Sequence, residues 1–168
     1  PKDTRAIVTT AKKFKVNLSV IKSVINSNSL RSKLLLKKIN KILNNKIRNK
    51  KICFLGVTFK ANTDDMRESS SLEMLPYLSS KGAKIKYYDP TGHKKEFKKI
   101  KNVNFANTIN DAVKGSDLVI LHTEWNDFKS IDFKKLNPSK KLKIFDMRNI
   151  FSPLKIKSQG FEFFGIGK

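Results

Sequence analysis

The segment "KICFLGV", residues 51–57, decides the fold, and the polar run "FKANTDDMRESSS", residues 59–71, follows it almost directly. A short apolar run bounded by polar residues is typical of a strand buried on both faces. The next segment, residues 70–82, has helical character, begins with serines and ends at a glycine, as capped helices do. A strand, a short loop and a helix in this order form the repeating unit of a parallel sheet.

The same alternation of strand and helix continues to the C-terminus. A short helix is expected at residues 108–117, and Pro90 ends the second strand-like segment. We therefore predict an α/β domain with a Rossmann-like parallel sheet, covered by helices on both faces. Its further strands are expected at residues 83–90 ("AKIKYYDP"), 117–123 ("DLVILHT"), 141–149 ("KLKIFDMRN") and 161–167 ("FEFFGIG").

The first fifty residues follow a different pattern. Residues 3–15 read as a short helix, and a second helix begins near Ser19 and keeps its apolar residues at helical spacing as far as Leu43. A helix of that length spans about 40 Å. It cannot bury its whole apolar stripe on a small domain, so we expect it to pack against a second copy or a further domain.

The asparagine-rich stretch "NNKIRNKK", residues 44–51, interrupts this helical pattern. We therefore predict two parts, a helical dimerisation segment at residues 1–48 and an α/β domain at residues 49–168. The total length of 168 residues suits one ordinary domain with an appendage.

The formal net charge of +22 raises the question of nucleic-acid binding. Of the 36 basic residues only five are arginines, which supply most specific base contacts, and the lysines are scattered along the chain. The distribution favours a lysine-rich surface, and we expect no nucleic-acid partner.

The cysteine and histidine content and the lengths of the apolar runs argue against disulfide-bonded, metal-binding and membrane-spanning proteins. The single cysteine, Cys53, lies within a strand, which indicates a buried core thiol and a reducing compartment. His93 and His122 match no metal-binding spacing. No apolar run approaches the roughly 18–20 residues that span a bilayer, and the start resembles no signal peptide. We expect a cytoplasmic protein without metal or membrane, and the missing initiator Met indicates a fragment or a processed product.

Two cations follow strands that should end at the same edge of the sheet. Lys60 and Arg148 could bind a phosphate or diphosphate there, and Gly56 could let a ligand approach the backbone. In the alternative interpretation, both cations belong to a structural salt-bridge network with the carboxylates Asp64, Asp65 and Asp146.

Other groups near these strand ends favour structural roles. The chain has no G-x-G-x-x-G and no G-x-x-x-x-G-K-[ST] loop. His122 could be a site residue, although a polar residue that merely ends the strand is the favoured interpretation. Trp125 and Phe128, three residues apart, indicate the core-facing side of a helix.

Five stretches together are similar to a known family. "GVTFKANTDDMRESSSLEML", "YYDP", "LHTEWNDFKSID", "FDMRNIFSP" and "GFEFFGIGK" resemble, in order and spacing, the C-terminal UDP-sugar-binding domain of UDP-glucose 6-dehydrogenases of the UDP-glucose/GDP-mannose dehydrogenase family. The segment "PKDTRAIVTTAKKFKVNLSVIKSVINSN" resembles the family's stretch after its catalytic cysteine, followed by its central dimer helix. The resemblance covers essentially the whole chain.

The resemblance implies an oxidation of UDP-glucose to UDP-glucuronate with two NAD+, through a cysteine-bound intermediate. The family's cysteine would lie two residues before Pro1, so this chain alone is expected to be inactive. By the same resemblance, Lys2 lies near NAD, and Asp3 is catalytic and helps to position the hydrolytic water.

The binding residues implied by the resemblance lie in two loops. Phe59 and Lys60 match the pair that contacts the UDP-sugar, and Arg67 matches an arginine on the NAD side of the cleft. Arg148 matches the substrate-contacting arginine of the family's D-G-R-N element, in which Met147 here replaces the glycine. Four further polar side chains are expected to orient the cations or cap the helix: Asp64, Asp65, Ser69 and Ser70.

Three classes of function remain open from the sequence. The first is the C-terminal part of a UDP-glucose 6-dehydrogenase, which binds UDP-glucose and forms a homodimer through the long helix. Its partner would then be an N-terminal NAD-binding half, which could be a separate chain. The second is a non-catalytic nucleotide-sugar-binding or dimerisation module, and the third is a nucleic-acid-binding protein. Within the first class, the substrate could instead be UDP-N-acetylmannosamine or GDP-mannose.

Overall fold

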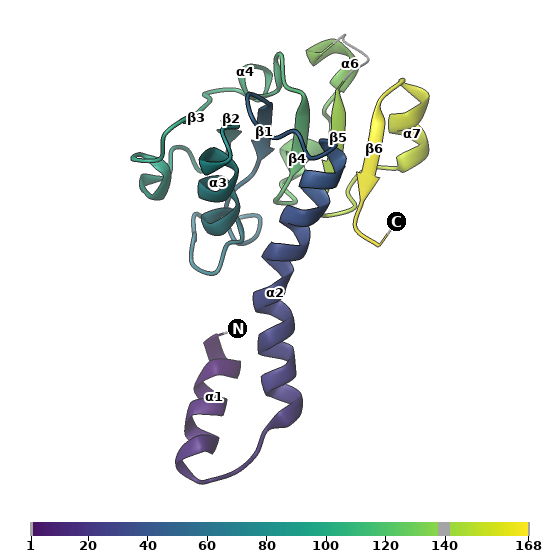
Figure 1. Cartoon of the computed structure of the whole chain (residues 1–168). Helices are drawn as coiled ribbons and strands as arrows, with labels where there is room; N and C mark the ends of the chain where they lie inside the picture. Colours follow the sequence, from purple (N-terminus) through teal and green to yellow (C-terminus); the bar gives the residue numbers. More distant parts are fainter. Residues whose placement is uncertain (1, 138–141, 168) are drawn as a thin grey trace. The chain divides into compact units, whose positions relative to one another are not determined.

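The computed structural model describes the backbone of residues 2–137 and 142–167, and the side chains of these residues apart from 2–5 and 29 (Figure 1). The chain divides into two compact units, the first ending at Ile39 and the second beginning at Asn40. Each unit is described by itself.

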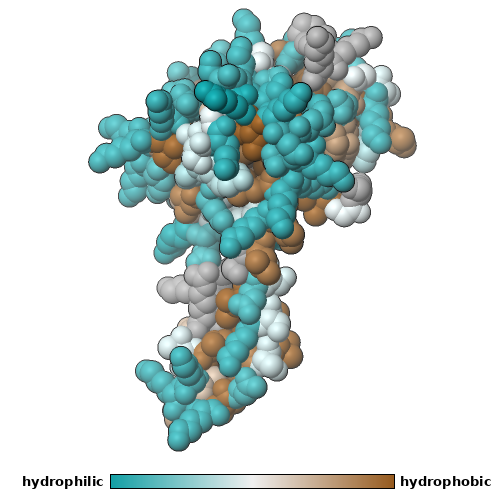
Figure 2. All heavy atoms as spheres, in the orientation of Figure 1, coloured by the Kyte–Doolittle hydropathy of each residue, from teal (hydrophilic) through white to brown (hydrophobic). Residues whose placement is uncertain are grey.

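The first unit contains helix α1, Lys2–Lys13, and most of helix α2, Ser19–Ile42. Both predicted helices are confirmed. Between them the chain turns at Lys15, which adopts a left-handed φ of 59°. Figure 2 shows hydrophobic and hydrophilic side chains interspersed on the visible surface of this unit. Among the side chains of this unit that the structure describes, seven large apolar ones are exposed: Ile7, Phe14, Val16, Val20, Val24, Leu30 and Leu34.

The second unit is built on a six-stranded, all-parallel sheet in the order β3-β2-β1-β4-β5-β6. This arrangement confirms the predicted parallel α/β domain. Strand β3 is absent from the prediction. The strands are β1 Lys51–Leu55, β2 Lys84–Tyr88, β3 Val103–Phe105, β4 Leu118–Leu121, β5 Lys143–Asp146 and β6 Glu162–Gly165.

The described helices of this unit are short, and two of them have polar side-chain caps. Thr108 accepts a hydrogen bond from the Asp111 amide at the start of α4, and Asp132 accepts from two amides at the start of α6. The remaining elements are α3 Ser71–Ser80, η1 Lys95–Phe97, α4 Ile109–Val113, α5 Asn126–Lys129, α6 Phe133–Leu136 and α7 Pro153–Ser158.

The core lies around the central strands β1 and β4. Cys53 is fully buried, which raises the pKa of its thiol and confirms the predicted core position. Trp125 and Phe128 are also buried in this core, as predicted from their spacing. None of the helices that the structure describes is long and apolar enough to cross a membrane.

The strand order places the topological switch point between β1 and β4: strands β1 to β3 are added to the sheet in one direction and β4 to β6 in the other. In parallel sheets, ligands bind beyond the carboxyl ends of the strands at this point. The loops that follow β1, β2, β4 and β5 therefore meet at one edge of the sheet, which we call the carboxyl edge. They contain residues 56–70, 89–94, 122–125 and 147–152.

Candidate functional site

Gly56 brings the loop after β1 close to the loop after β4. Its φ is +76°, and a Cβ atom at this position would lie 2.5 Å from the Cβ of Thr123. Its amide donates a 2.8 Å hydrogen bond to the Tyr88 carbonyl. The space beside Gly56 is thus filled by Thr123, so packing explains this glycine better than the ligand approach expected from the sequence.

Phe59 and Lys60 lie at the tip of a tight loop on the carboxyl edge. The Phe59 amide donates to the Asp65 carbonyl at 2.9 Å, and the Thr58 hydroxyl donates to the Lys60 carbonyl at 3.1 Å. The Phe59 ring is 38% exposed and Lys60 is exposed. Within the described part of the chain, the Lys60 ammonium forms no hydrogen bond or ion pair, so it is available to an anionic ligand.

Arg67 is paired with Asp65 in the same loop. Its Nη2 lies 2.8 Å from Asp65 Oδ2, and its Nε donates to Asp65 Oδ1 at 3.0 Å. The hydrogen bonds from Arg67 lower the pKa of the Asp65 carboxyl to about 2. The loop also holds Glu68 at a φ of 64°, which is uncommon for a residue with a side chain. Asp65 thus orients Arg67, as expected.

Arg148 joins three strand ends. Its Nε donates to the His122 carbonyl at 2.7 Å and lies 3.0 Å from Glu124 Oε2, and its Nη2 donates to the Phe59 carbonyl at 3.4 Å. The guanidinium therefore lies beside the backbone of Phe59, directly before Lys60. The structure brings together the three residues that the sequence assigned to the UDP-sugar: Phe59, Lys60 and Arg148.

The carboxylate that pairs with Arg148 is Glu124, which the sequence analysis did not single out. Asp146, one of the expected partners, instead accepts hydrogen bonds from the backbone amides of Arg148 and Phe151, both at 2.9 Å. Met147 is 7% exposed and its amide donates to the Leu121 carbonyl. The residue that replaces the family's glycine is thus buried.

His122 is buried and neutral, and it joins the end of β4 to Ser70, directly before α3. Its Nε2 lies 2.8 Å from Ser70 Oγ, and its Nδ1 lies 3.1 Å from Thr123 Oγ1. Because the Thr123 hydroxyl donates its proton to the Thr58 carbonyl, Nδ1 must carry the imidazole proton and Nε2 must accept from Ser70. Burial, with a smaller contribution from Arg148, lowers the pKa of His122 to about 3. This is the structural role favoured from the sequence.

The serines before α3 fix the loop more than they cap the helix. Ser70 occupies the N-cap position but makes no capping hydrogen bond, since its hydroxyl is bonded to His122. Ser69 Oγ donates to the Val57 carbonyl at 2.6 Å, and Ser71 Oγ donates to the same carbonyl. The helix does begin where expected, while the side chains serve the loop after β1.

Asp89 is a polar residue of this edge that the sequence analysis missed as a site candidate. It directly follows β2, is 1% exposed, and its Oδ2 accepts from the Val57 amide at 2.8 Å. The only signal in the sequence was its position within "YYDP", directly after a strand.

The side chains of Lys2 and Asp3, which the sequence analysis assigned to the NAD site and to catalysis, lie outside the described residues.

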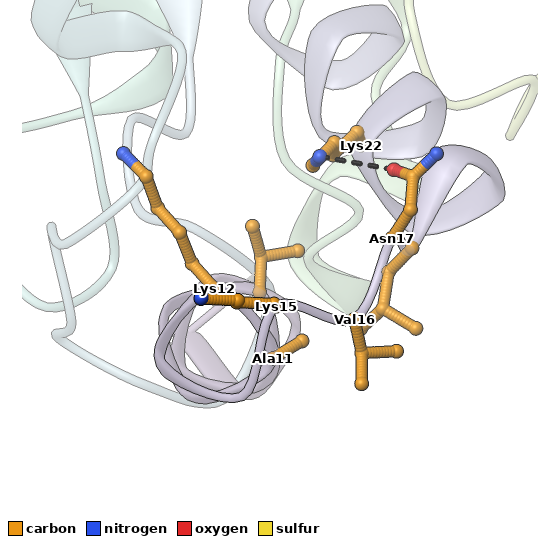
Figure 3. A pocket seen from close by; sticks show the side chains of 8 residues that line it. Ala11, Lys12, Lys15, Val16, Asn17 and Lys22 are labelled. Carbon is orange, nitrogen blue, oxygen red and sulfur yellow. Dashed lines mark hydrogen bonds between the residues drawn. The ribbon is translucent and has the colours of Figure 1, made fainter.

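A hollow of about 210 Å³ lies wholly in the first unit (Figure 3), and no expected site residue lines it. In it, Lys22 Nζ donates to Asn17 Oδ1 at 3.1 Å. Among the described residues, no group of three or more His, Cys, Asp or Glu could hold a metal ion.

Comparison with known families assigns most of this domain to one of them. Residues 53–153, which include the loops after β1, β2, β4 and β5, match the UDP-glucose/GDP-mannose dehydrogenase family, UDP binding domain. The chain belongs to this family. This membership confirms the family resemblance, and the matched residues contain four of the five sequence stretches that carried it.

Relatives in the UDP-glucose/GDP-mannose dehydrogenase family extend the match to the whole chain. The UDP-glucose 6-dehydrogenase of Rickettsia prowazekii is 33% identical over 171 residues, which cover 99% of this chain and 39% of the relative. That of Bacillus subtilis is 35% identical over 173 residues, covering 100% of this chain and 38% of the relative. This chain thus spans less than two fifths of the length of either relative.

Solved structures support the fold. A UDP-glucose dehydrogenase from Pyrobaculum islandicum superposes with a TM-score of 0.80 at 23% identity, covering 98% of this chain and 36% of that one. A likeness at this identity shows the Rossmann-like fold of the UDP-glucose/GDP-mannose dehydrogenase family and confirms the predicted fold class.

Proposed function

We propose that this chain is the UDP-sugar-binding part of a UDP-glucose 6-dehydrogenase, the enzyme that oxidises UDP-glucose to UDP-glucuronate with NAD. The observation that supports it best is the contact of the Arg148 guanidinium with the Phe59 carbonyl, which gathers the three expected substrate residues at the carboxyl edge. The named relatives are UDP-glucose 6-dehydrogenases, which favours UDP-glucose among the nucleotide sugars.

The two cations suit a diphosphate in different ways. Lys60 presents a mobile point charge without a protein partner among the described residues. Arg148 is held through Nε and one contact of Nη2, so its remaining N–H groups can donate to a phosphate oxygen. The partly exposed Phe59 ring offers an apolar face for a sugar or a base.

NAD, the hydride acceptor of this family, would meet only a few residues of this chain. Arg67 fits such a contact, because its side chain is 84% exposed and Asp65 fixes its orientation. A fixed, exposed guanidinium can bind a phosphate of the cofactor. Lys2 near NAD and Asp3 at the hydrolytic water remain proposals from the family resemblance, as do the domain division at residues 48 and 49 and the cytoplasmic location.

The test is a calorimetric titration of UDP-glucose into the purified chain at physiological salt, with GDP-mannose and UDP-N-acetylmannosamine as controls. We expect saturable binding selective for UDP-glucose. Lys60→Ala and Arg148→Ala should each weaken it by about tenfold or more, since each removes a charge-assisted contact. Leu154→Ala, on an exposed position of α7, is the matched surface control. Equal affinities of all variants would contradict the site assignment.

A further inference from the structure

The Asp89 carboxylate is buried at the carboxyl end of β2 and is fully engaged. Its Oδ2 accepts from the amides of Val57 at 2.8 Å and Thr58 at 3.3 Å, and lies 3.4 Å from the Thr58 hydroxyl, which donates to the nearer Lys60 carbonyl. Its Oδ1 accepts from the amide of Thr91 at 3.0 Å and from the Thr91 hydroxyl. One carboxylate therefore ties the loop after β2 to the loop after β1.

Lys94 neutralises this carboxylate within the same buried network. Its side chain is 5% exposed and its Nζ lies 3.9 Å from Asp89 Oδ1. The Lys94 ammonium also donates to the Thr91 hydroxyl, and its amide donates to the Tyr87 hydroxyl at 2.9 Å. A buried charge is tolerated when it is paired and hydrogen-bonded, and a fully satisfied network holds its members in one geometry.

The backbone of Val57 and Thr58 is held from three sides. Asp89 binds both amides, the serine hydroxyls before and at the start of α3 bind the Val57 carbonyl, and Thr123 donates to the Thr58 carbonyl at 3.0 Å. The next two residues are Phe59 and Lys60. Because the Lys60 ammonium has no partner in the described part of the chain, its place depends on the backbone that precedes it.

We propose that Asp89 is a positioning residue of the nucleotide-sugar site, which acts by fixing the Val57–Thr58 backbone so that Phe59 and Lys60 face the ligand. The proposal rests on the proposed function, since it assigns a ligand to these two residues. Asp89 itself is only 1% exposed, so its effect on binding passes through Lys60 and Phe59.

A matched control lies at the opposite ends of the strands. Asp117 precedes β4, accepts from the amide of Lys51 at 2.8 Å and pairs with Lys50 Nζ at 3.0 Å. It thus combines a backbone contact and a lysine partner, as Asp89 does, but at the amino end of β1. Asp89→Asn and Asp117→Asn keep the size of the side chain and remove the charge in each place.

The experiment combines amide hydrogen exchange with titration of UDP-glucose. In Asp89→Asn we expect faster exchange at Val57, Thr58 and Phe59 and an affinity for UDP-glucose lowered by about tenfold or more. In Asp117→Asn we expect no change at either readout. If Asp89→Asn does not fold, the double variant Asp89→Asn/Lys94→Met removes both charges and takes its place.

A double-mutant cycle separates positioning from general loss of stability. If Asp89 acts through Lys60, then Asp89→Asn weakens binding less in the Lys60→Ala background than in the wild type. Unchanged exchange, unchanged affinity or additive effects would each overturn the positioning role. If the wild type binds no nucleotide sugar, the proposed function fails, and the effect of Asp89 on ligand binding fails with it. Amide exchange still reports separately whether Asp89 fixes the Val57–Thr58 backbone.

Discussion

At the scale of single residues, position 56 tolerates no methyl group. In Gly56→Ala the added Cβ would lie 2.5 Å from the Thr123 Cβ, and alanine would adopt a φ of +76°. Overpacking and the unfavourable φ should together lower the free energy of unfolding by about 2–4 kcal/mol. Urea denaturation followed by the fluorescence of Trp125 measures this loss.

Gly92→Ala separates the destabilisation due to overpacking from that due to the unfavourable φ. Gly92 has a similar φ of +83°, but a Cβ atom added there would meet nothing within 4 Å, so only the backbone cost of about 1 kcal/mol remains. The difference between the variants reports the contact with Thr123. A Gly56→Ala protein no less stable than Gly92→Ala would show that the loops after β1 and β4 are not packed as described.

Sequence reasoning named the candidate cations of this edge but not the carboxylates that hold them and their loop in place. Lys60 and Arg148 could be named as candidates because each lies in a loop after a strand, and parallel strands end at a common edge; only the family resemblance implied that they bind a UDP-sugar. Glu124 and Asp89 could not, because their partners depend on which loops are neighbours in space. That information lies in the strand order, with β1 between β2 and β4, which residue patterns do not contain.

At the scale of elements, the prediction of self-association rests on the exposed apolar side chains of α2. Leu34 is 62% exposed on this helix, and Val20 and Val24 are exposed as well. If these side chains are buried between two copies, Leu34→Asp places a charge in an apolar interface and should raise the dimer dissociation constant by about tenfold or more. Sedimentation equilibrium measures this constant.

Leu154→Asp is the control for this experiment. Leu154 is 81% exposed on α7, outside the helices of the first unit, so its replacement should leave association unchanged. Leu35 is unsuitable for the test because it is only 6% exposed, and a charge there would destabilise the fold itself. A Leu34→Asp protein that associates like the wild type would contradict dimerisation through α2.

Element lengths explain which parts of the fold were predicted. The long periodic pattern of α2 and the apolar runs of β1 and β4 are strong signals, and all three elements were found. β3 has only three residues, of which Val103 alone is buried, so neither alternation nor an apolar run distinguishes it from a loop. Its pairing with β2 makes it a strand.

At the scale of the whole molecule, the chain spans 39% of its Rickettsia relative and contains no G-x-G-x-x-G loop. We predict that the chain alone produces no NADH from UDP-glucose and NAD. Fusion to the N-terminal part of the Bacillus subtilis relative should restore NADH production, monitored by its absorbance. The same fusion carrying Lys60→Ala should have a raised KM for UDP-glucose, and a KM equal to that of the unmutated fusion would argue against substrate binding by this chain.

The order of the strands also governs how the protein folds as it is synthesised. β1 lies at the centre of the sheet, yet one of its two neighbours is β4, where Ile52 pairs with Leu118, so the ribosome must add more than sixty residues before this pair can form. Contacts between such distant residues form slowly, and unpaired strand edges promote aggregation. Nascent chains that stall before β4 would expose one side of β1, in which four of the five residues are apolar and buried in the finished fold, so chaperones that bind extended apolar segments are expected to associate with this stretch during translation.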